Sequence, residues 1–599
     1  MILCYIGKAF PQPVFFSVFT ELEMSVNQID AKISALKDAK AEEKMDTSVE
    51  TSSAPRQQKD KPENLLLEVL STIRQFHPVE FVAFQRVYTE MKKLRLDWTE
   101  IALTTIRDLL EEAYRIAFEF RADIHGALLS ANMETKLNSL NDLFDFELSN
   151  LKDTPEHRRK EHTIVSLRAG FNADFNFEAS PRHRCILNVI PLLQKWEKTL
   201  EACVKQLADY LLLREKSKYL STFCPQVATL QVFGELMVLK SDQYSVKVAR
   251  FLPRVERLMG PHTVAQRIWI RGHNGKLFSF LLQSSETRAE MNKSDRVLQF
   301  SRFLNHMFLK SKGTAERLMQ ISCRRSVNLG PGLTVTEDEQ LKSLLELLWK
   351  ICEEDNLDCN AMINKYYEKL AIAAAKGGQP SQQILREILK DIQSAFLPKS
   401  KLRHWVLNRF PDATDFFTFR KYLSLHLSVF NMLEYVLHLT RMNPKDLWLQ
   451  LESGFAYATG FKFDLKEDTG ELDANRPVPF RLTPCIVNLL GWSVHGGLES
   501  SLLAASRCLY QQKLPLLLRP FLWDEIAEWK ERTLGTSQRT PPEQEEMIAA
   551  VEKAVSTITN RLQNLVSFDN SKSTVQTLVS AAQSIDNLCR MDPSWHPWL

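Results

Sequence analysis

Residues 246–283 read VKVARFLPRVERLMGPHTVAQRIWIRGHNGKLFSFLLQ, and this segment decides the fold. It contains three short runs rich in β-branched and aromatic residues, VKVARFL, QRIWIR and LFSFLLQ. Turn signals separate them, a Gly-Pro pair at Gly260 and an Asn-Gly pair at Asn274. The segment therefore predicts a small antiparallel sheet.

Apolar residues at helical spacing precede and follow this segment in the sequence. Upstream, the clearest amphipathic stripe comprises Trp98, Ile101, Ile106, Leu109, Leu110, Ala113, Ile116, Ala117 and Phe120. We expect several such helices to pack side by side up to about residue 220. Downstream, helical periodicity returns near residue 296 and continues through 419–439. A small β-rich lobe followed by a larger helical lobe is an α+β arrangement typical of kinases, although other α+β proteins share it.

Length and composition bound the class of protein. With 599 residues, 44% hydrophobic and 25% charged, the chain is expected to fold into several domains. The formal net charge of +3 gives no global reason to bind nucleic acid or an anionic membrane. One local basic cluster, EHRRKEH at 156–162, is expected to be a solvated loop, with nucleic acid or an import receptor as the alternatives.

The remaining composition indicates a reduced intracellular protein. None of the ten cysteines forms a CxxC pair, and we expect mostly buried thiols. No stretch is apolar enough to span a bilayer, which predicts a soluble protein without membrane contact. Residues 1–19 are apolar but lack the features of a signal peptide, and we expect a helical piece of a longer chain. Residues 39–64 are polar and predict a disordered linker.

Four motifs carry a resemblance to a known family. ANRPVPFRLTP (474–484) resembles the segment after the activation loop in phosphatidylinositol-kinase-related protein kinases, and NLCRMDPSWHPWL (587–599) resembles their closing FATC motif. With IRGHNGK (270–276) and FPDATDFFTFRK (410–421), they resemble the TRRAP branch of that family and its fungal counterparts. The resemblance covers about residues 65–599 and implies α-helical FAT repeats, a two-lobed phosphatidylinositol-kinase-like domain and a short helical FATC tail.

The resemblance also places the positions at which active relatives carry catalytic residues. Gln283 stands at the phosphate-binding lysine, and glutamine has no positive charge. In TRMNPKDL (440–447), Arg441 stands at the catalytic aspartate, Asn443 at the histidine and Asp446 at the metal-binding asparagine. Phosphoryl transfer needs these groups to position the phosphates and Mg²⁺.

The metal-binding loop is altered as well. The three positions of the DFG motif are occupied by Gly460, Phe461 and Lys462, and Asp464 could reach a metal only in a rebuilt loop. GPHTVA (260–265), at the phosphate-facing loop, lacks basic residues. Replacing carboxylates by arginine and lysine opposes Mg²⁺ binding by charge repulsion. The resemblance thus implies a pseudokinase with no catalytic residue, no bound metal and no cofactor.

Motifs for other chemistries are absent from the sequence. GPG at 330–332 has neither Walker nor GxGxxG spacing and reads as a hinge turn. There is no HExxH and no GxSxG nucleophile elbow. His157 and His162 are expected to be exposed residues and not zinc ligands.

The resemblance leads to a domain division and a function. The expected parts are an unassigned segment (1–38), the linker (39–64), the end of the FAT region (65–228), the pseudokinase domain (229–566) and FATC (567–599). The implied function is a nuclear scaffold in histone acetyltransferase coactivator complexes of SAGA-like and MYST-type composition, docking transcription activators without sequence-specific nucleic-acid binding. Two alternatives are an active atypical serine/threonine kinase and a lipid kinase.

The C-terminal segment is expected to be part of the helical lobe and not a free tail. An apolar helical stripe is formed by Val575, Leu578, Val579, Ala582, Ile585 and Leu588. Trp595, Trp598 and Leu599 follow, and exposing them would risk aggregation. The alternative is a tail that touches a membrane, because tryptophan favours interfaces.

Overall fold

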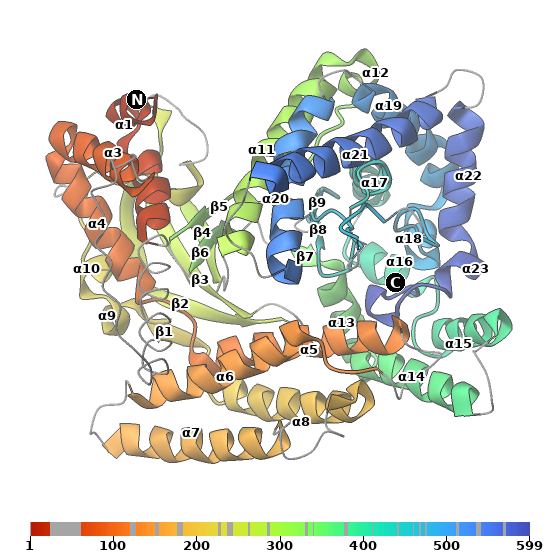
Figure 1. The fold of residues 1–599 in the computed structure, drawn as a ribbon, viewed down its shortest axis with the longest axis horizontal. Coiled ribbons are helices and arrows are strands. Elements are labelled where there is room, and N and C mark those ends of the chain that lie inside the picture. Colours follow the sequence, from red (N-terminus) through yellow and green to blue (C-terminus); the bar gives the residue numbers. More distant parts are fainter. Residues whose placement is uncertain are drawn as a thin grey trace, which may run out of the picture.

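The structure of the chain is a computed structural model in which a β-rich lobe and a helical lobe lie above a layer of long helices (Figure 1). The residues that it describes, with Met1 and the intervening segments excluded, are 2–23, 62–119, 127–149, 155–175, 184–225, 229–235, 244–260, 264–283, 288–329, 333–338, 341–375, 381–410, 412–439, 442–458, 461–466, 469–473, 476–510, 514–534, 541–566 and 571–599. Most of the predicted linker, residues 39–61, lies outside the described residues, as does the predicted hinge turn at 330–332. Residues 62–64 belong to a helix, and the predicted linker is wrong there.

The β-rich lobe is built on a six-stranded antiparallel sheet with strand order β1-β2-β3-β4-β6-β5. Its strands are β1 (Tyr210–Leu212), β2 (Val248–Met259), β3 (Val264–Gly272), β4 (Leu277–Gln283), β5 (Ser326–Asn328) and β6 (Thr334–Glu337). The three predicted strands are confirmed as β2, β3 and β4. Strand β2 runs seven residues beyond its predicted end at Leu252, because Pro253 is accommodated in a register irregularity between Phe251 and Val255.

Helices from the start of the chain cover this sheet. They are α1 (Ile2–Ala9), a helix over residues 11–23, α3 (Pro62–Phe76) and α4 (Pro78–Lys92), joined by α9 (Leu213–Lys216), α10 (Lys218–Ser221) and η2 (Phe233–Glu235). Phe16 is buried and its ring meets those of Phe84 and Phe233, at centroid distances of 6.2 and 6.0 Å. Residues 2–23, part of the segment left unassigned from sequence, therefore pack into the core of the β-rich lobe. Helices α3 and α4 share this core, so the expectation that they pack side by side with the later helices is wrong.

A separate layer of four helices lies along both lobes (Figure 1). It contains α5 (Trp98–Glu119), α6 (Ala131–Ser149), α7 (Pro155–Asp174) and α8 (Ile186–Lys205). Asp97 and Glu100 form a capping box at the start of α5: Thr99 N donates to Asp97 Oδ1 at 3.1 Å, and Asp97 N donates to Glu100 Oε2 at 2.7 Å. The apolar stripe of α5 is buried as predicted, from Ile106 to Ala117.

The basic cluster at 156–162 was expected in a loop, but it lies on helix α7. Proline is favoured at the first position of a helix, and α7 begins at Pro155. Arg158, Lys160 and His162 are exposed, so the expectation of a solvated surface is confirmed.

The helical lobe surrounds one central helix, α17 (Ala413–Val436). Asp412 caps α17 by accepting a hydrogen bond from Thr414 N at 3.2 Å, and most of the C-terminal half of the helix is buried. A three-stranded sheet of β7 (Lys342–Ser343), β8 (Leu447–Leu449) and β9 (Ala456–Ala458) lies beside it. The other helices are α11 (Arg288–Lys310), α12 (Lys312–Ala315), α13 (Leu344–Glu354), α14 (Cys359–Ala375), α15 (Gln382–Ala395), α16 (Lys401–Leu407), α18 (Pro484–Leu490), η4 (Gly491–Ser493), η5 (Val494–Leu498), α19 (Glu499–Leu509), α20 (Leu514–Leu534) and α21 (Pro541–Val566).

The C-terminal segment folds back into this lobe, as predicted. It forms α22 (Ser571–Gln583), α23 (Ile585–Leu588) and η6 (Pro593–Trp595), and η6 contacts α5. Trp595 is 1% exposed, and Trp598 and Leu599 are fully buried. The alternative of a membrane-touching tail is contradicted, because these side chains have no exposed surface to insert.

Two expectations about the surface have clear outcomes. Four of the ten free thiols are fully buried, five are half-buried and Cys224 is exposed, so the expectation of mostly buried thiols is only partly right. Within the described ranges, no helix is long and apolar enough to cross a membrane.

Candidate functional site

A cleft of about 240 Å³ lies between the two lobes. It is bordered by β2, β3 and β4 on one side and by α13 and β8 on the other, and its lining is Leu258, Met259, Gly260, Ala265, Arg267, Leu281, Gln283, Arg324, Asp338, Leu341, Lys342, Glu346, Trp349, Lys350, Glu353 and Trp448. This position matches the nucleotide cleft that the kinase resemblance implies.

Gln283 lines the cleft from the last position of β4. Its Oε1 atom accepts a hydrogen bond from Thr336 Oγ1 of β6 at 3.4 Å. A neutral amide held by a neighbouring strand offers no charge to a phosphate.

Both arginines of the cleft already contact protein groups. Arg267 donates to Asp338 Oδ2 at 2.6 Å and to Glu256 Oε2 at 3.1 Å. The Arg324 guanidinium lies 4.4 Å from the centre of the Trp448 indole ring. Burial, together with the nearby charges of Lys342 and Arg409, lowers the pKa of Lys350. A nucleotide would have to displace the contacts of Arg267 and Arg324 to gain charge stabilisation from these two arginines.

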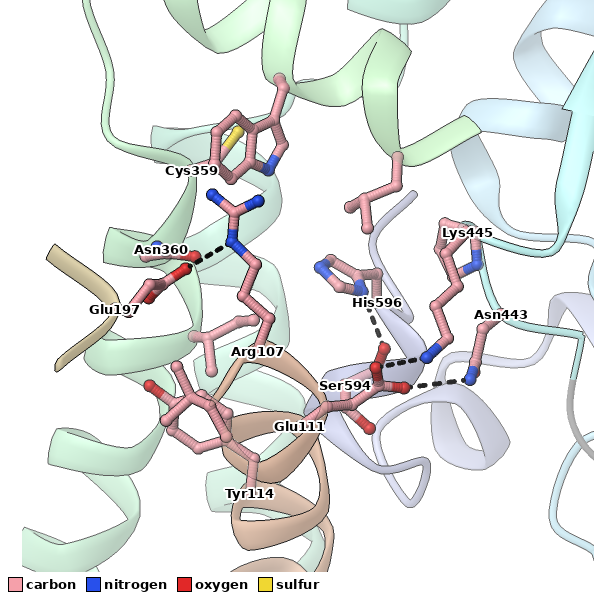
Figure 2. Close-up of a pocket in the computed structure, with 15 residues that line it drawn as sticks. Arg107, Glu111, Tyr114, Glu197, Cys359, Asn360, Asn443, Lys445, Ser594 and His596 are labelled. Atoms are coloured by element: carbon pink, nitrogen blue, oxygen red, sulfur yellow. Dashed lines mark hydrogen bonds and ion pairs between the residues drawn. The ribbon is translucent and has the colours of Figure 1, made fainter. Parts of the chain in front are cut away.

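The segment at the predicted catalytic loop faces helix α5 and not the cleft (Figure 2). Thr440 and Arg441 lie outside the described residues. Asn443 Nδ2 donates to Glu111 Oε1 at 3.3 Å, and Lys445 Nζ donates to Glu111 Oε2 at 2.6 Å. Burial opposes the charge on Lys445, but the carboxylates of Glu111 and Asp108 dominate and raise its pKa.

Asp446 closes the same turn through its backbone N–H, which donates to Asn443 O at 3.0 Å. Its carboxylate favours the charged forms of the half-buried Lys445 and the buried Arg481. The structure therefore places Asp446 among cations.

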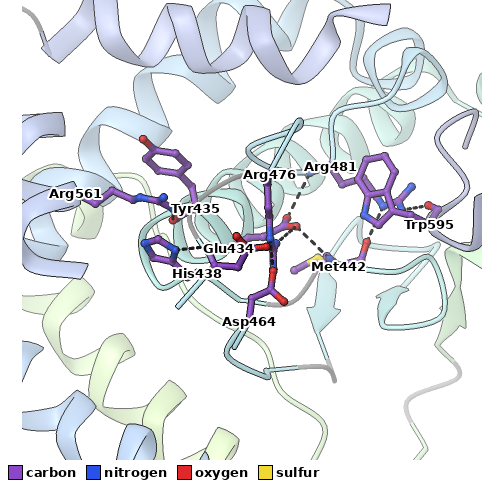
Figure 3. A network of polar contacts seen from close by, with 10 residues as sticks. Glu434, Tyr435, His438, Met442, Asp464, Arg476, Arg481, Arg561 and Trp595 are labelled. Carbon is purple, nitrogen blue, oxygen red and sulfur yellow. Dashed lines mark hydrogen bonds and ion pairs between the residues drawn. The ribbon is translucent and has the colours of Figure 1, made fainter. Parts of the chain in front are cut away.

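The carboxylates nearest to the predicted metal loop are held by one arginine (Figure 3). Gly460 lies outside the described residues, Phe461 is buried against Phe300, and Lys462 is half-buried. Arg476 donates to Asp464 Oδ2 at 2.7 Å from Nε and at 2.5 Å from Nη2, and its Nη1 atom lies 3.8 Å from Glu434 Oε1.

Glu434, on α17, is the buried centre of this network. Its carboxylate accepts from Met442 N at 3.1 Å and from Arg481 N at 3.4 Å. Burial raises the pKa of Glu434, and the charge of Arg476 opposes that rise. A guanidinium already in contact with both carboxylates would repel Mg²⁺ from them. Among the described residues, no group of three or more His, Cys, Asp or Glu side chains could hold a metal ion.

Arg481 links this network to the C-terminal segment. Its Nε donates to Met442 O at 2.8 Å and its Nη1 donates to Leu599 O at 2.8 Å. Its Nη2 donates to Trp595 O, and the guanidinium lies 3.8 Å from the centre of the Trp595 ring. Burial lowers the pKa of Arg481 to about 9, although Glu434 favours its charged form.

Helix α5 also holds the β-rich lobe. Arg107 Nη1 donates to Gly260 O at 2.8 Å, at the start of the predicted phosphate-facing loop, while its other nitrogens pair with Glu197 and Glu201 of α8. Residues 261–263 of that loop lie outside the described residues. The joint between α5, the 443–445 turn and η6 encloses only about 50 Å³, too little for a nucleotide (Figure 2).

The charged residues of α5 were not predicted from the sequence. Glu100, Arg107 and Glu111 lie on a helix with a strong apolar stripe, and Glu100 and Arg107 are nearly fully buried. Charged residues seven and four positions apart lie on one helix face, and that spacing was the available signal. The positions predicted from the resemblance do not converge: Gln283 lines the cleft, Asn443 lines the α5 joint, and Asp464 faces Arg476.

Comparisons with known proteins agree with this architecture. Residues 287–530 match the family model of phosphatidylinositol 3- and 4-kinases, and residues 571–599 match the FATC domain. The transformation/transcription domain-associated protein of Danio rerio is 34% identical over 629 residues, covering 100% of this chain and 16% of the relative. The SAGA complex/NuA4 acetyltransferase complex subunit TRA1 of Saccharomyces cerevisiae is 27% identical over 469 residues, covering 72% of this chain and 12% of the relative.

A solved structure, the complete CtTel1 dimer with C2 symmetry, is 14% identical with a TM-score of 0.48, covering 100% of this chain and 22% of that chain. Because it covers 16% of the Danio rerio relative, the chain spans about a sixth of that relative's length.

Proposed function

Because the chain belongs to the TRRAP branch of the phosphatidylinositol-kinase-related kinase family, we propose that it is the non-catalytic C-terminal region of a scaffold subunit. The scaffold assembles into histone acetyltransferase coactivator complexes and docks transcription activators to them. The yeast relative is named as a subunit of the SAGA and NuA4 acetyltransferase complexes, which supports this assignment. A nuclear location, membership of SAGA-like and MYST-type assemblies, and activators as partners are parts of the same proposal.

One observation carries the non-catalytic half of this proposal: Arg476 occupies the carboxylates of Asp464 and Glu434. In an active kinase, carboxylates near this position bind Mg²⁺, and the metal neutralises the transferred phosphate. Here Arg476, a permanent cation, takes the place of the metal and neutralises these two carboxylates.

The residue correspondences with active relatives support the same reading. Gln283 lacks charge, and Asn443 serves as a contact to α5. Arg441, Asp446, Gly460 and Lys462 complete the degenerate positions that we assign. Removing one preorganised charge-stabilising group costs about 10² to 10³ in rate, and several such losses at one cleft leave no measurable phosphoryl transfer.

The direct test measures nucleotide binding and phosphoryl transfer with purified protein. We expect no Mg²⁺-dependent rise in melting temperature with ATP and no transfer of radiolabelled phosphate to protein or lipid. The variants Asp464→Asn and Asp446→Asn test any residual signal, and Asp391→Asn, an exposed carboxylate of α15, is the matched control. Transfer that is lost in the first two variants and kept in the control would overturn the pseudokinase proposal in favour of an active kinase.

The scaffold half has its own test. Affinity purification of the full-length protein from nuclear extract, followed by mass spectrometry, should recover acetyltransferase subunits in stoichiometric amounts. Recovery of the intact protein without any acetyltransferase subunit would contradict it, whatever the outcome of the nucleotide experiment.

A further inference from the structure

One surface of the helical lobe combines exposed aromatic side chains with unpaired cations. It consists of Arg403 on α16, Phe417, Arg420 and Lys421 on α17, and Trp492 on η4, and we call it the outer face. Trp492 is 93% exposed and Phe417 is 60% exposed. Nearly complete exposure of a tryptophan is unusual, because burying a large aromatic side chain stabilises a fold by several kcal/mol, about 3–5 when measured by truncation.

The fold brings these residues together at one turn. Helix α16 packs on α18, and α18 ends at Leu490, so that only Gly491 separates it from Trp492. Gly491 has a φ of 58°, and a Cβ atom there would lie 3.2 Å from Arg420 Nη1. Phe417 precedes Arg420 by three residues, so both lie on the same face of α17. Arg420 therefore lies one helical turn from Phe417 and close to Gly491, the residue before Trp492, while its guanidinium lies 5.0 Å from the centre of the buried Phe416 ring.

The cations of the outer face are not neutralised by the protein. Arg403, Arg420 and Lys421 make no ion pair with a carboxylate of the described residues, in contrast to Arg267 of the cleft and Arg476 of the buried network. Arg420 Nε is buried and has no hydrogen-bond partner there. Burial and the nearby charge of Arg403 lower the pKa of Arg420, as expected for a cation without an acid beside it.

The acidic residues in the neighbourhood have other contacts or positions. Asp412 caps the N-terminus of α17, and Asp415 lies in its first turn, where the helix dipole favours a carboxylate. Glu499 pairs with His495 at 3.2 Å. The charges of Arg403, Arg420 and Lys421 therefore leave the surface near Trp492 positive.

We propose that the outer face binds an acidic segment of a partner protein that also carries an apolar or aromatic side chain. Carboxylates would pair with Arg403, Arg420 and Lys421, and the apolar side chain would pack between Phe417 and Trp492. Tryptophan and arginine are the residues that most often dominate binding energy at interfaces, and charge-assisted bonds to carboxylates give the arrangement its specificity. This inference goes beyond the scaffold proposal, because the surface binds such a segment whichever complex the protein joins.

The same cations could in principle contact phosphates, but the arrangement favours a protein. A specific nucleic-acid complex neutralises about 6–10 phosphates, and three cations beside two aromatic residues fall well short of that number. The exposed Phe417 and Trp492 add apolar area that a phosphate backbone would leave unused.

The test measures binding to the purified chain by fluorescence anisotropy. The probe is a labelled peptide in which Asp and Glu alternate with Phe and Leu. Two comparison probes are the same peptide with Ser in place of Phe and Leu, and a labelled single-stranded oligonucleotide of equal charge. We expect the first probe to bind at least tenfold more tightly than either comparison probe. Trp492→Ala should weaken it about tenfold or more, and Arg403→Glu combined with Lys421→Glu should weaken it similarly.

Matched controls come from the β-rich lobe, where Lys276 and Leu277 form an exposed cation and an exposed apolar residue. Lys276→Glu and Leu277→Ala should leave binding unchanged, and melting temperatures establish that all variants fold. The inference is overturned if the acidic-apolar peptide does not bind, if Trp492→Ala binds it as well as the parent, or if the oligonucleotide binds more tightly.

Discussion

The cleft between the lobes and the outer face of the helical lobe use the same residue types in opposite ways. Arg267 in the cleft and Arg476 in the network behind it are held by the protein's own carboxylates, Asp338 and Asp464. On the outer face, Arg420 has no carboxylate partner among the described residues, and it lies close to Gly491, which precedes the exposed Trp492. Two arginines on the cleft side are therefore neutralised by the protein itself, whereas no described carboxylate neutralises the three cations of the outer face.

The largest difference between the two regions should appear on deleting Trp595–Leu599. Truncating one buried tryptophan costs about 3–5 kcal/mol, and this deletion removes two of them together with acceptors of Arg481. Because whole domains are stable by about 5–15 kcal/mol, we expect unfolding of the helical lobe and loss of soluble protein. Soluble yield and circular dichroism measure this. Trp492→Ala, a tryptophan of the outer face, should change stability by less than about 0.5 kcal/mol. A truncated protein that melts like the parent would refute the buried role of the tail.

A smaller but still large loss is expected for Arg481→Met. The substitution keeps the apolar volume but leaves the carbonyl groups of Met442 and Trp595 without a donor. Removing one partner from a buried charged network typically costs about 3–5 kcal/mol. Urea denaturation of this variant and of Arg420→Met, the matched arginine of the outer face, should separate the two. Equal midpoints for both variants would contradict the distinction between the regions.

The pH dependence of stability sharpens the description of the network further. Burial lowers the pKa of His438 to about 4, where it faces Arg561, Arg476 and Asp473. The unfolded chain therefore binds the proton first, and the stability that His438 contributes falls as pH drops from about 6.5 toward 4, by about 2 kcal/mol at pH 5. Burial also lowers the pKa values of His426 and His596 to about 4, so His438→Asn should reduce the total fall by this share and not abolish it. Asparagine does not titrate and tolerates the φ of 50° found there. Melting temperatures between pH 8 and pH 5 measure the slope, and parallel curves for the two proteins would contradict this account.

The smallest effect concerns the contact between α5 and the 443–445 turn. Glu111→Gln keeps the shape but removes the charge that pairs with Lys445, which should cost about 1–2 kcal/mol. Arg420→Gln on the outer face should cost less than about 0.5 kcal/mol. Hydrogen exchange of residues 442–447 should accelerate only in the first variant. Acceleration in both variants would mean that the two regions are not independent.

The parts of the fold that the sequence predicts are those with local patterns. The strands at 246–283 alternate short apolar runs with turn signals, and the stripe from Val575 to Leu588 repeats within a few helical turns. The burial of Trp595 and Trp598 followed from their size and apolarity. These features need no knowledge of distant partners.

The parts that escaped prediction depend on contacts between residues far apart in the chain. Phe16 meets Phe233, and Glu111 meets Lys445, in both cases across more than two hundred residues. A sequence pattern shows that Phe16 is apolar, but not which sheet buries it. For the candidate site, the resemblance indicated which positions lost catalytic residues, but not that Arg476 holds Asp464.

Helix α5 has a mechanical consequence. Arg107 donates a hydrogen bond to Gly260 O of the β-rich lobe. Four residues later, Glu111 accepts one from Lys445 of the helical lobe. Four residues of helix span about 6 Å, so both lobes are attached to about one turn of α5. Enzymes that open and close on each turnover need hinge freedom between their lobes. Because both lobes are attached to the same turn of α5, they cannot open and close in that way. The helix can instead transmit a force from one lobe to the other without a change in shape.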